Sequence, residues 1–139
     1  MRYILDTHAL IWLFSSQDNN LPTYIRESVR YCEDSFFVSE VSLIEIIQLQ
    51  QGKRITLNYR PDTVRSMVEE NGIIFIPATT DILTCYFDMP IPTIKGARHS
   101  DPFDRIIIAT ALKRNMTVVS ADTKFPWYSE NYGLELLQI

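Results

Sequence analysis

The alternation of short apolar runs with helical patterns constrains the fold of this chain more than any other feature. Apolar runs typical of buried strands occur at residues 3–5, 35–38, 73–76, 117–120 and 134–137. Helical patterns lie between them, at residues 21–31, 40–51, 62–71, 80–87 and 101–114, and another helix begins directly after the first strand. This order predicts a single α/β domain over residues 1–139, in which about five parallel strands form a central sheet between two layers of helices.

Local signals predict where these elements begin and end. Thr7 is the predicted N-cap of the first helix, which breaks at residues 18–20, and Gly52 ends the helix at 40–51. Residues 88–100 hold two prolines and a glycine, so they form the longest predicted loop. Residues 122–126 are predicted to form a turn.

Two aspartates follow strands directly. Asp6 ends the first apolar run, and Asp122 comes shortly after the strand at 117–120. Because the carboxyl ends of parallel strands meet at one edge, where open α/β sheets bind ligands, the two carboxylates are expected on the same edge. Each also has a plain structural reading, Asp6 as a helix cap and Asp122 as a turn residue.

Glu45 stands inside an otherwise apolar helical segment. Leu43, Ile44, Ile46 and Ile47 surround the helix axis almost completely, so this helix is predicted to be mostly buried. Since a lone buried carboxylate is costly, Glu45 either lies on a narrow polar stripe with Ser42 and Gln48 or faces a polar pocket that holds a cation.

The segment from Asp101 to Ala111 is the most informative one. Asp101 is the predicted N-cap of the helix, and Asp104 stands in its first turn. Asp104 also shares a helix face with Ile107 and Ile108, which is the face expected to meet the core. An acid on that face needs more than the helix dipole to stay charged, which favours a functional role.

Charge and composition limit the classes of function. The net charge of −4 argues against a broad basic surface for nucleic acid, but it is compatible with a small acidic pocket neutralised by a metal. Carboxylates favour Mg²⁺ or Mn²⁺ over zinc, and neither His8 nor His99 has a partner at metal-ligand spacing. Cys32 and Cys85 are predicted to be reduced core residues of a cytoplasmic protein.

Nothing in the sequence predicts attachment to a membrane. The apolar stretch at residues 3–14 is too short to span a bilayer and is interrupted by Asp6 and His8. The apolar and aromatic residues within 10–14 and 21–31 are either core or a partner interface.

Four motifs together resemble a known family. LDTHALIW, SEVSLIEI, DPFDRIIIATA and VVSADTKF, in this order, are similar to the PIN domain in the form found in VapC-type toxins of toxin–antitoxin pairs. The resemblance spans Asp6 to Phe125, and each motif carries an acid at the expected place. It implies a PIN-like three-layer α/β/α sandwich and an acidic site formed by Asp6, Glu45, Asp104 and Asp122. It further implies metal-dependent endonucleolytic cleavage of RNA, a homodimer, and an antitoxin protein that holds the toxin inactive.

The chemistry assigns roles within that site. Asp6 and Asp104 are the expected direct ligands of Mg²⁺ or Mn²⁺, while Glu45 and Asp122 act through water or hold a second ion. Asp101 is either a further ligand or only a helix cap. The candidates for contacts with the RNA are Thr7, Ser42, Lys53, Arg54, Lys95, Arg98 and Arg105.

Other functions fit the sequence less well. An aspartate-nucleophile phosphatase typically has a second Asp two residues after the first, where this chain has His8. A response-regulator receiver usually has an adjacent acidic pair before its first helix, which is not evident here. A PIN-like module that binds RNA or a protein without cutting stays open, because only an assay separates it from an enzyme.

Overall fold

A five-stranded parallel sheet forms the centre of the protein. The computed structural model describes residues 1–15 and 20–139. The strands are β1 (Arg2–Leu5), β2 (Ser35–Ser39), β3 (Ile74–Ile76), β6 (Thr117–Ser120) and β7 (Leu136–Gln138). They pair side by side in the order β3-β2-β1-β6-β7. The predicted α/β fold with a parallel central sheet is confirmed.

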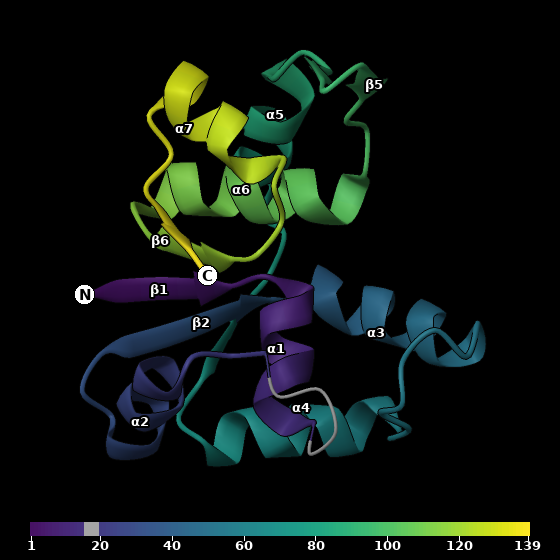
Figure 1. Ribbon diagram of the computed structural model, residues 1–139, viewed down its shortest axis with the longest axis vertical. Helices are drawn as coiled ribbons and strands as arrows, with labels where there is room; N and C mark the ends of the chain where they lie inside the picture. The colour runs from purple at the N-terminus through teal and green to yellow at the C-terminus, as the bar shows by residue number, and fades with distance from the viewer. Residues whose placement is uncertain (16–19) are drawn as a thin grey trace.

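Helices cover both faces of this sheet (Figure 1). They are α1 (Thr7–Phe14), α2 (Thr23–Tyr31), α3 (Val41–Gln51), α4 (Pro61–Glu70), α5 (Thr80–Asp88), α6 (Pro102–Arg114) and α7 (Phe125–Tyr132). Helices α1, α2 and α4 share one apolar core with Leu5 and Val119, whereas α5, α6 and α7 share the other with Ile4 and Val118. Neighbouring residues of β1 and β6 thus enter opposite cores, as the pleat of a strand requires.

The strand order places a crevice at a defined point. From β1 the chain proceeds outward through β2 to β3, and it then returns to the other side of β1 to form β6 and β7. The order therefore reverses between β1 and β6, and α/β sheets bind ligands at the carboxyl ends of the strands at such a reversal. Helix α3 packs against α1 and α6 and closes one side of this region.

Two elements were not predicted. Helix α7 occupies residues assigned to a turn and its surroundings; Pro126 suits its first turn, and the burial of Phe125 and Tyr128 stabilises a segment rich in aromatic residues. The predicted loop 88–100 contains the hairpin of β4 (Thr93–Ile94) and β5 (Ala97–Arg98). Lys95 and Gly96 join these strands, and both have positive φ, as a two-residue type I′ turn requires.

The prediction of Thr7 as the N-cap of α1 is wrong by one residue, whereas the interpretation of Asp6 as a helix cap is confirmed. Asp6, not Thr7, is the N-cap, since the Asp6 carboxylate accepts a hydrogen bond from the backbone N–H of Ala9. The predicted helix break at residues 18–20 falls largely on residues 18 and 19, which lie outside the described part of the chain.

Most of the apolar residues near the N-terminus belong to the core. Leu10, Ile11, Ile25 and Val29 are buried, whereas the aromatic rings of Tyr24 and Tyr31 are exposed on α2. Within residues 1–15 and 20–139, no helix has the length and apolar composition needed to cross a membrane.

Candidate active site

Asp6 lies at the carboxyl end of β1, buried at the crevice. Its Oδ1 accepts the hydrogen bond from Ala9 N at 2.8 Å, and its Oδ2 accepts one from the hydroxyl of Ser120 at the end of β6. Only 5% of Asp6 is exposed. Burial raises the pKa of Asp6 from 3.8 to about 6, although its two hydrogen bonds act in the opposite direction.

Asp104 reaches the same crevice from the first turn of α6. Its Oδ2 accepts a hydrogen bond from Nε2 of His99 at 3.1 Å. Burial raises the pKa of Asp104 above its usual value, while the bond from His99 lowers it. Asp101 is the N-cap of α6 and accepts from the backbone N–H groups of Phe103 and Asp104. The predicted cap is confirmed, and a further role of Asp101 as a ligand stays a prediction.

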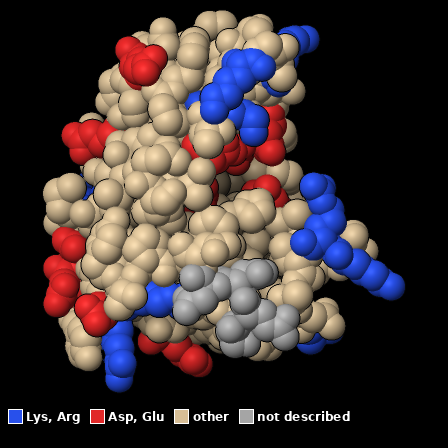
Figure 2. Space-filling model, viewed as in Figure 1, with Lys and Arg blue, Asp and Glu red and all other residues tan. Residues whose placement is uncertain are grey.

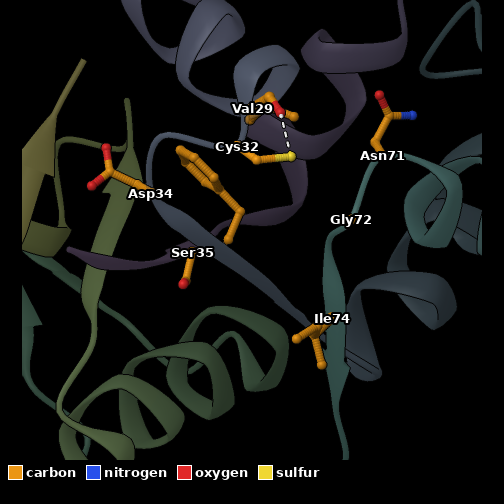
Figure 3. A pocket seen from close by; sticks show the side chains of 8 residues that line it. Val29, Cys32, Asp34, Ser35, Asn71, Gly72 and Ile74 are labelled. Carbon is orange, nitrogen blue, oxygen red and sulfur yellow. Dashed lines mark hydrogen bonds between the residues drawn. The ribbon is translucent and has the colours of Figure 1, made fainter.

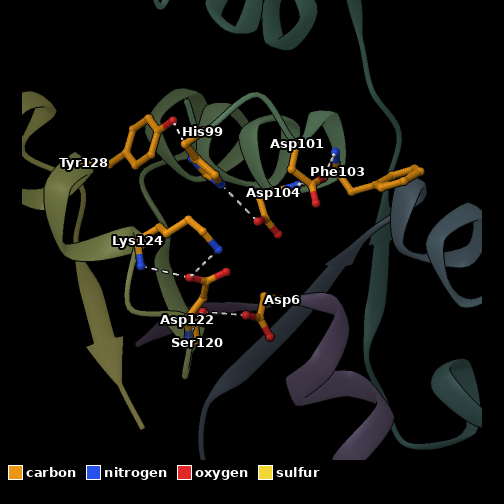
Figure 4. Close-up of polar contacts among 9 residues, drawn as sticks. All are labelled: Asp6, His99, Asp101, Phe103, Asp104, Ser120, Asp122, Lys124 and Tyr128. Atoms are coloured by element: carbon orange, nitrogen blue, oxygen red, sulfur yellow. Dashed lines mark hydrogen bonds and ion pairs between the residues drawn. The ribbon is translucent and has the colours of Figure 1, made fainter. Parts of the chain in front are cut away.

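Asp122 follows β6 and is tied to Asp6 through one serine. The hydroxyl of Ser120 donates to Asp6 and accepts a hydrogen bond from Asp122 N at 3.0 Å. The side chain of Asp122 accepts from Lys124 N at 2.8 Å and pairs with Lys124 Nζ at 3.6 Å. Figure 4 shows the carboxylates of Asp6, Asp104 and Asp122 directed toward a common space.

Glu45 enters from α3 with an unpaired oxygen. Its Oε1 is buried and has no hydrogen-bond partner among the described residues. Burial raises the pKa of Glu45, and the negative charges of Asp104 and Asp101 raise it further. Of the predicted polar stripe, Gln48 is exposed, whereas Ser42 is fully buried.

The pKa shifts of the acids indicate that their charges act on one another. After burial, the charge of Asp104 is among the causes that raise the pKa of both Asp6 and Glu45. The charges of Asp101 and Asp122 raise the pKa of Asp104 in turn. The four predicted acids are therefore close enough to interact, although they come from four separate segments of the chain.

The donor set fits a hard divalent cation held by few direct ligands. Among residues 1–15 and 20–139, no group of three or more His, Cys, Asp or Glu side chains is arranged to hold a metal ion by itself. Mg²⁺ typically binds to one or two carboxylates and keeps several waters. Such an ion would give the unpaired oxygen of Glu45 a partner. It would also balance the negative charges of Asp6 and Asp104, whose pKa values are raised.

Three of the predicted RNA contacts make contacts within the fold, and their role toward RNA stays a prediction. Thr7 and Ser42 are buried, and their hydroxyls hydrogen-bond to each other at 3.0 Å, which joins α1 to the helix that carries Glu45. Arg105 is only 3% exposed; its guanidinium donates to the carbonyl of Met89 and stacks over Tyr86 at 5.2 Å. Arg105 also lies close to Tyr128: burial raises the pKa of the Tyr128 hydroxyl, and the neighbouring Arg105 lowers it.

The remaining predicted contacts lie on exposed loops. Lys95 and Arg98 are on the β4–β5 hairpin, and Lys53 and Arg54 follow the end of α3. None of these four cations has an ion-pair partner among the described residues. Figure 2 shows acidic side chains in a hollow of the visible face and basic side chains above it and to its right.

A separate pocket lies at the opposite, amino end of the sheet (Figure 3). It is lined by residues that include Cys32, Asp34, Asn71 and Gly72. Cys32 is exposed, so the prediction of a core cysteine is wrong at this position, and Cys85 is only half-buried. Cys32 ends α2 in the left-handed conformation, where the chain turns at the surface into β2.

Sequence reasoning missed two residues that hold the acids in place. Ser120 stands two residues before Asp122 at a strand end, a pattern typical of a serine turn, and that pattern was the available signal. His99 was set aside because it lacks metal-ligand spacing. It is 3% exposed and bonded to Asp104, and nothing in its local sequence indicated that contact.

Comparison with known proteins bears on the fold. Over its whole length the chain is similar to three solved structures: VapBC2 from Rickettsia felis bound to a promoter DNA fragment (15% identity, TM-score 0.65), VapBC-1 from nontypeable Haemophilus influenzae (20%, 0.62) and VapBC-5 from Mycobacterium tuberculosis (18%, 0.59). Each match covers 99% of this chain and 98% of the other. No curated protein sequence shows a significant match. The family model of the PIN domain matches residues 3–130, and the chain therefore belongs to the PIN domain family.

Proposed function

We propose that the protein is a Mg²⁺- or Mn²⁺-dependent endoribonuclease of the VapC toxin type. What supports this proposal is that Asp6, Asp104 and Asp122 are directed toward a common space (Figure 4), and that, after burial, the charge of Asp104 raises the pKa of Glu45 on α3. Four mutually repelling, partly desolvated carboxylates destabilise a protein unless a cation binds them. The grouping of these acids in one cleft is thus better explained by a bound ion than by a contribution to the stability of the fold.

Within this proposal, Asp6 and Asp104 are the direct ligands. Each oxygen of Asp6 accepts one hydrogen bond, from Ala9 N or from Ser120, and Oδ2 of Asp104 accepts one from His99, so both carboxylates keep lone pairs with which to bind an ion. A bound divalent ion lowers the pKa of a water molecule and neutralises charge on the scissile phosphate. Glu45 and Asp122 orient water around the site or complete a second ion position.

The RNA backbone is proposed to contact the two basic loops. Lys95 and Arg98 on the hairpin, and Lys53 and Arg54 after α3, are free to bind phosphates because no described carboxylate pairs with them. Phosphate contacts of this kind position a nucleic acid without reading its sequence. Few basic residues are needed, which reconciles an RNA substrate with a net charge of −4.

We further propose an antitoxin protein and a second copy of the chain as partners, acting in the cytoplasm. Support comes from the similar solved structures, of which VapBC-5 is described as a member of the VapBC family of toxin–antitoxin systems. The exposed rings of Tyr24 and Tyr31 on α2 offer apolar surface for such a contact. Co-purification of the chain with the product of a neighbouring gene would test the antitoxin.

Cleavage of total cellular RNA tests the enzyme directly. We expect cuts in the presence of Mg²⁺ or Mn²⁺, none after EDTA, and none with Asp6→Asn, whose asparagine still caps α1. Asp62→Asn is the matched control, since Asp62 is an exposed acid on α4. RNA binding without any cleavage at saturating metal would instead identify a module that binds and does not cut.

A further inference from the structure

A line of hydrogen bonds leads from α7 to the carboxylate of Asp104. The hydroxyl of Tyr128 lies 2.9 Å from Nδ1 of His99, and Nε2 of the same ring lies 3.1 Å from Asp104 Oδ2 (Figure 4). Both His99 and Tyr128 are buried. The three residues come from the end of the β4–β5 hairpin, from α7 and from α6, so the contact depends on the whole fold on this side of the sheet.

The chemistry of the partners fixes the direction of the bond to Asp104. A carboxylate only accepts hydrogen bonds, so Nε2 of His99 must carry the hydrogen. In a neutral ring Nδ1 is then an acceptor, and the Tyr128 hydroxyl donates to it; in a charged ring the tyrosine oxygen accepts instead. The N–H of Nε2 points at Asp104 whether the histidine is neutral or charged.

Two aromatic rings and a backbone hydrogen bond hold His99 in place. Tyr128 contacts it edge-on with ring centres 5.5 Å apart, and Phe125 lies at 6.5 Å. Its backbone N–H donates to the carbonyl of Pro92 at 2.9 Å, which fastens the base of the hairpin. Since only Oδ2 of Asp104 is engaged, Oδ1 has no hydrogen-bond partner among the described residues and remains available to the cleft.

We propose that His99 and Tyr128 are positioning residues that hold the Asp104 carboxylate in the orientation in which it binds the divalent cation. This inference rests on the proposed function, because it needs Asp104 to be a ligand. Residues that hydrogen-bond to a metal ligand without touching the metal typically contribute 10- to 100-fold to metal affinity. The competing explanation is that His99 only packs the hairpin against α7.

Two substitutions of His99 separate these explanations, because each keeps one of the two hydrogen bonds of the ring and removes the other. In His99→Gln the amide nitrogen takes the place of Nε2 and still reaches Asp104. In His99→Asn the amide nitrogen takes the place of Nδ1, so the contact with Tyr128 is kept and the contact with Asp104 is lost. Tyr128→Phe removes one oxygen, and Tyr132→Phe is its matched control, since Tyr132 stacks on Tyr128 at 6.1 Å and is partly exposed.

Calorimetric titration with Mn²⁺ measures the effect on the intact chain, and urea unfolding without metal measures stability in parallel. We expect His99→Asn to weaken Mn²⁺ binding about 10- to 100-fold, His99→Gln to retain most of the affinity, and Tyr128→Phe to lie between them. Tyr132→Phe is expected to bind as wild type does. Should His99→Asn fail to fold, Tyr128→Phe decides between positioning of Asp104 and packing of the hairpin.

The inference is overturned if His99→Asn binds Mn²⁺ like wild type, or if the two His99 variants weaken binding equally and in proportion to lost stability. In that event a wild type that binds Mn²⁺ and an Asp6→Asn variant that does not would leave the proposed function intact. Absence of Mn²⁺ binding by wild type would instead refute the proposed function and this inference with it.

Discussion

Replacing Asp6 by asparagine is expected to stabilise the metal-free protein at neutral pH, although the change removes a proposed ligand. The carboxylate is buried beside other acids, and its pKa lies at about 6 instead of 3.8. Asparagine has nearly the same shape, caps the helix equally well and carries no charge. The variant thus avoids the cost of an ionised group in this place.

The magnitude follows from the pKa. Each pH unit of difference between the folded and unfolded pKa corresponds to about 1.4 kcal/mol, so ionised Asp6 costs about 3 kcal/mol above pH 6. Loss of the hydrogen bond from Ser120 offsets about 1 kcal/mol. We expect a net gain of about 2 kcal/mol, which raises the melting temperature by about 5–10 °C for a domain of this size.

The sign of the effect changes with pH. Below the ordinary pKa of 3.8, Asp6 is protonated in both the folded and the unfolded state, so burial costs nothing and wild type is the more stable protein. Between pH 3.8 and about 6 the unfolded state ionises first, and wild type loses stability relative to the variant. Above about pH 6 the difference is constant.

Urea unfolding in EDTA at several pH values from 3.5 to 8 measures this difference. Asp62→Asn serves as the control, because Asp62 is exposed and its replacement should give a flat difference from wild type. A gap between wild type and Asp6→Asn that stays the same across the whole pH range would refute the reasoning, since it would mean that Asp6 is not a buried charge in the folded protein.

Four further predictions concern neighbouring groups. Mn²⁺ at 100 times its Kd should stabilise wild type by about 2.7 kcal/mol in thermal unfolding and leave Asp6→Asn unmoved. Ser120→Ala removes a bond that lowers the pKa of Asp6 in the folded protein. The pH at which the loss of stability is complete should therefore move upward, above about 6, and an unchanged pH contradicts this. Arg105→Met leaves the carbonyl of Met89 unpaired and should cost about 2–3 kcal/mol in urea unfolding, against no loss for Arg60→Met on the surface. Arg98→Gln should weaken RNA binding and reduce its salt dependence by about one phosphate contact, whereas Lys113→Gln at the end of α6 should change neither.

The sequence predicted those features that depend on periodicity. Strand runs such as residues 117–120 are apolar throughout, so they indicate a buried parallel strand, and the helix of Pro102–Arg114 has both a cap and an apolar face. Asp6 and Asp122 were placed together because parallel strands share a carboxyl edge. Asp104 and Glu45 were singled out by their positions in apolar helices, and the resemblance to the PIN domain joined the four acids into one site.

Features that depend on tertiary packing were not predictable in this way. Tyr128 meets His99 only because α7 forms, and α7 is stabilised by burial of its aromatic residues and not by a helical pattern of its own. Ser120 and Asp6 are 114 residues apart, so no local signal links them. Likewise, the contacts of Arg105 with the carbonyl of Met89 and the ring of Tyr86 depend on the packing of α6 against α5.

A crystal soaked with MnCl₂ and measured at the manganese absorption edge tests the central claim most directly. If Asp6, Glu45, Asp104 and Asp122 form one cation site, an anomalous difference peak will lie between Asp6 and Asp104, bonded to an oxygen of each. A peak elsewhere, or none at saturating Mn²⁺ with these side chains ordered, would contradict the account.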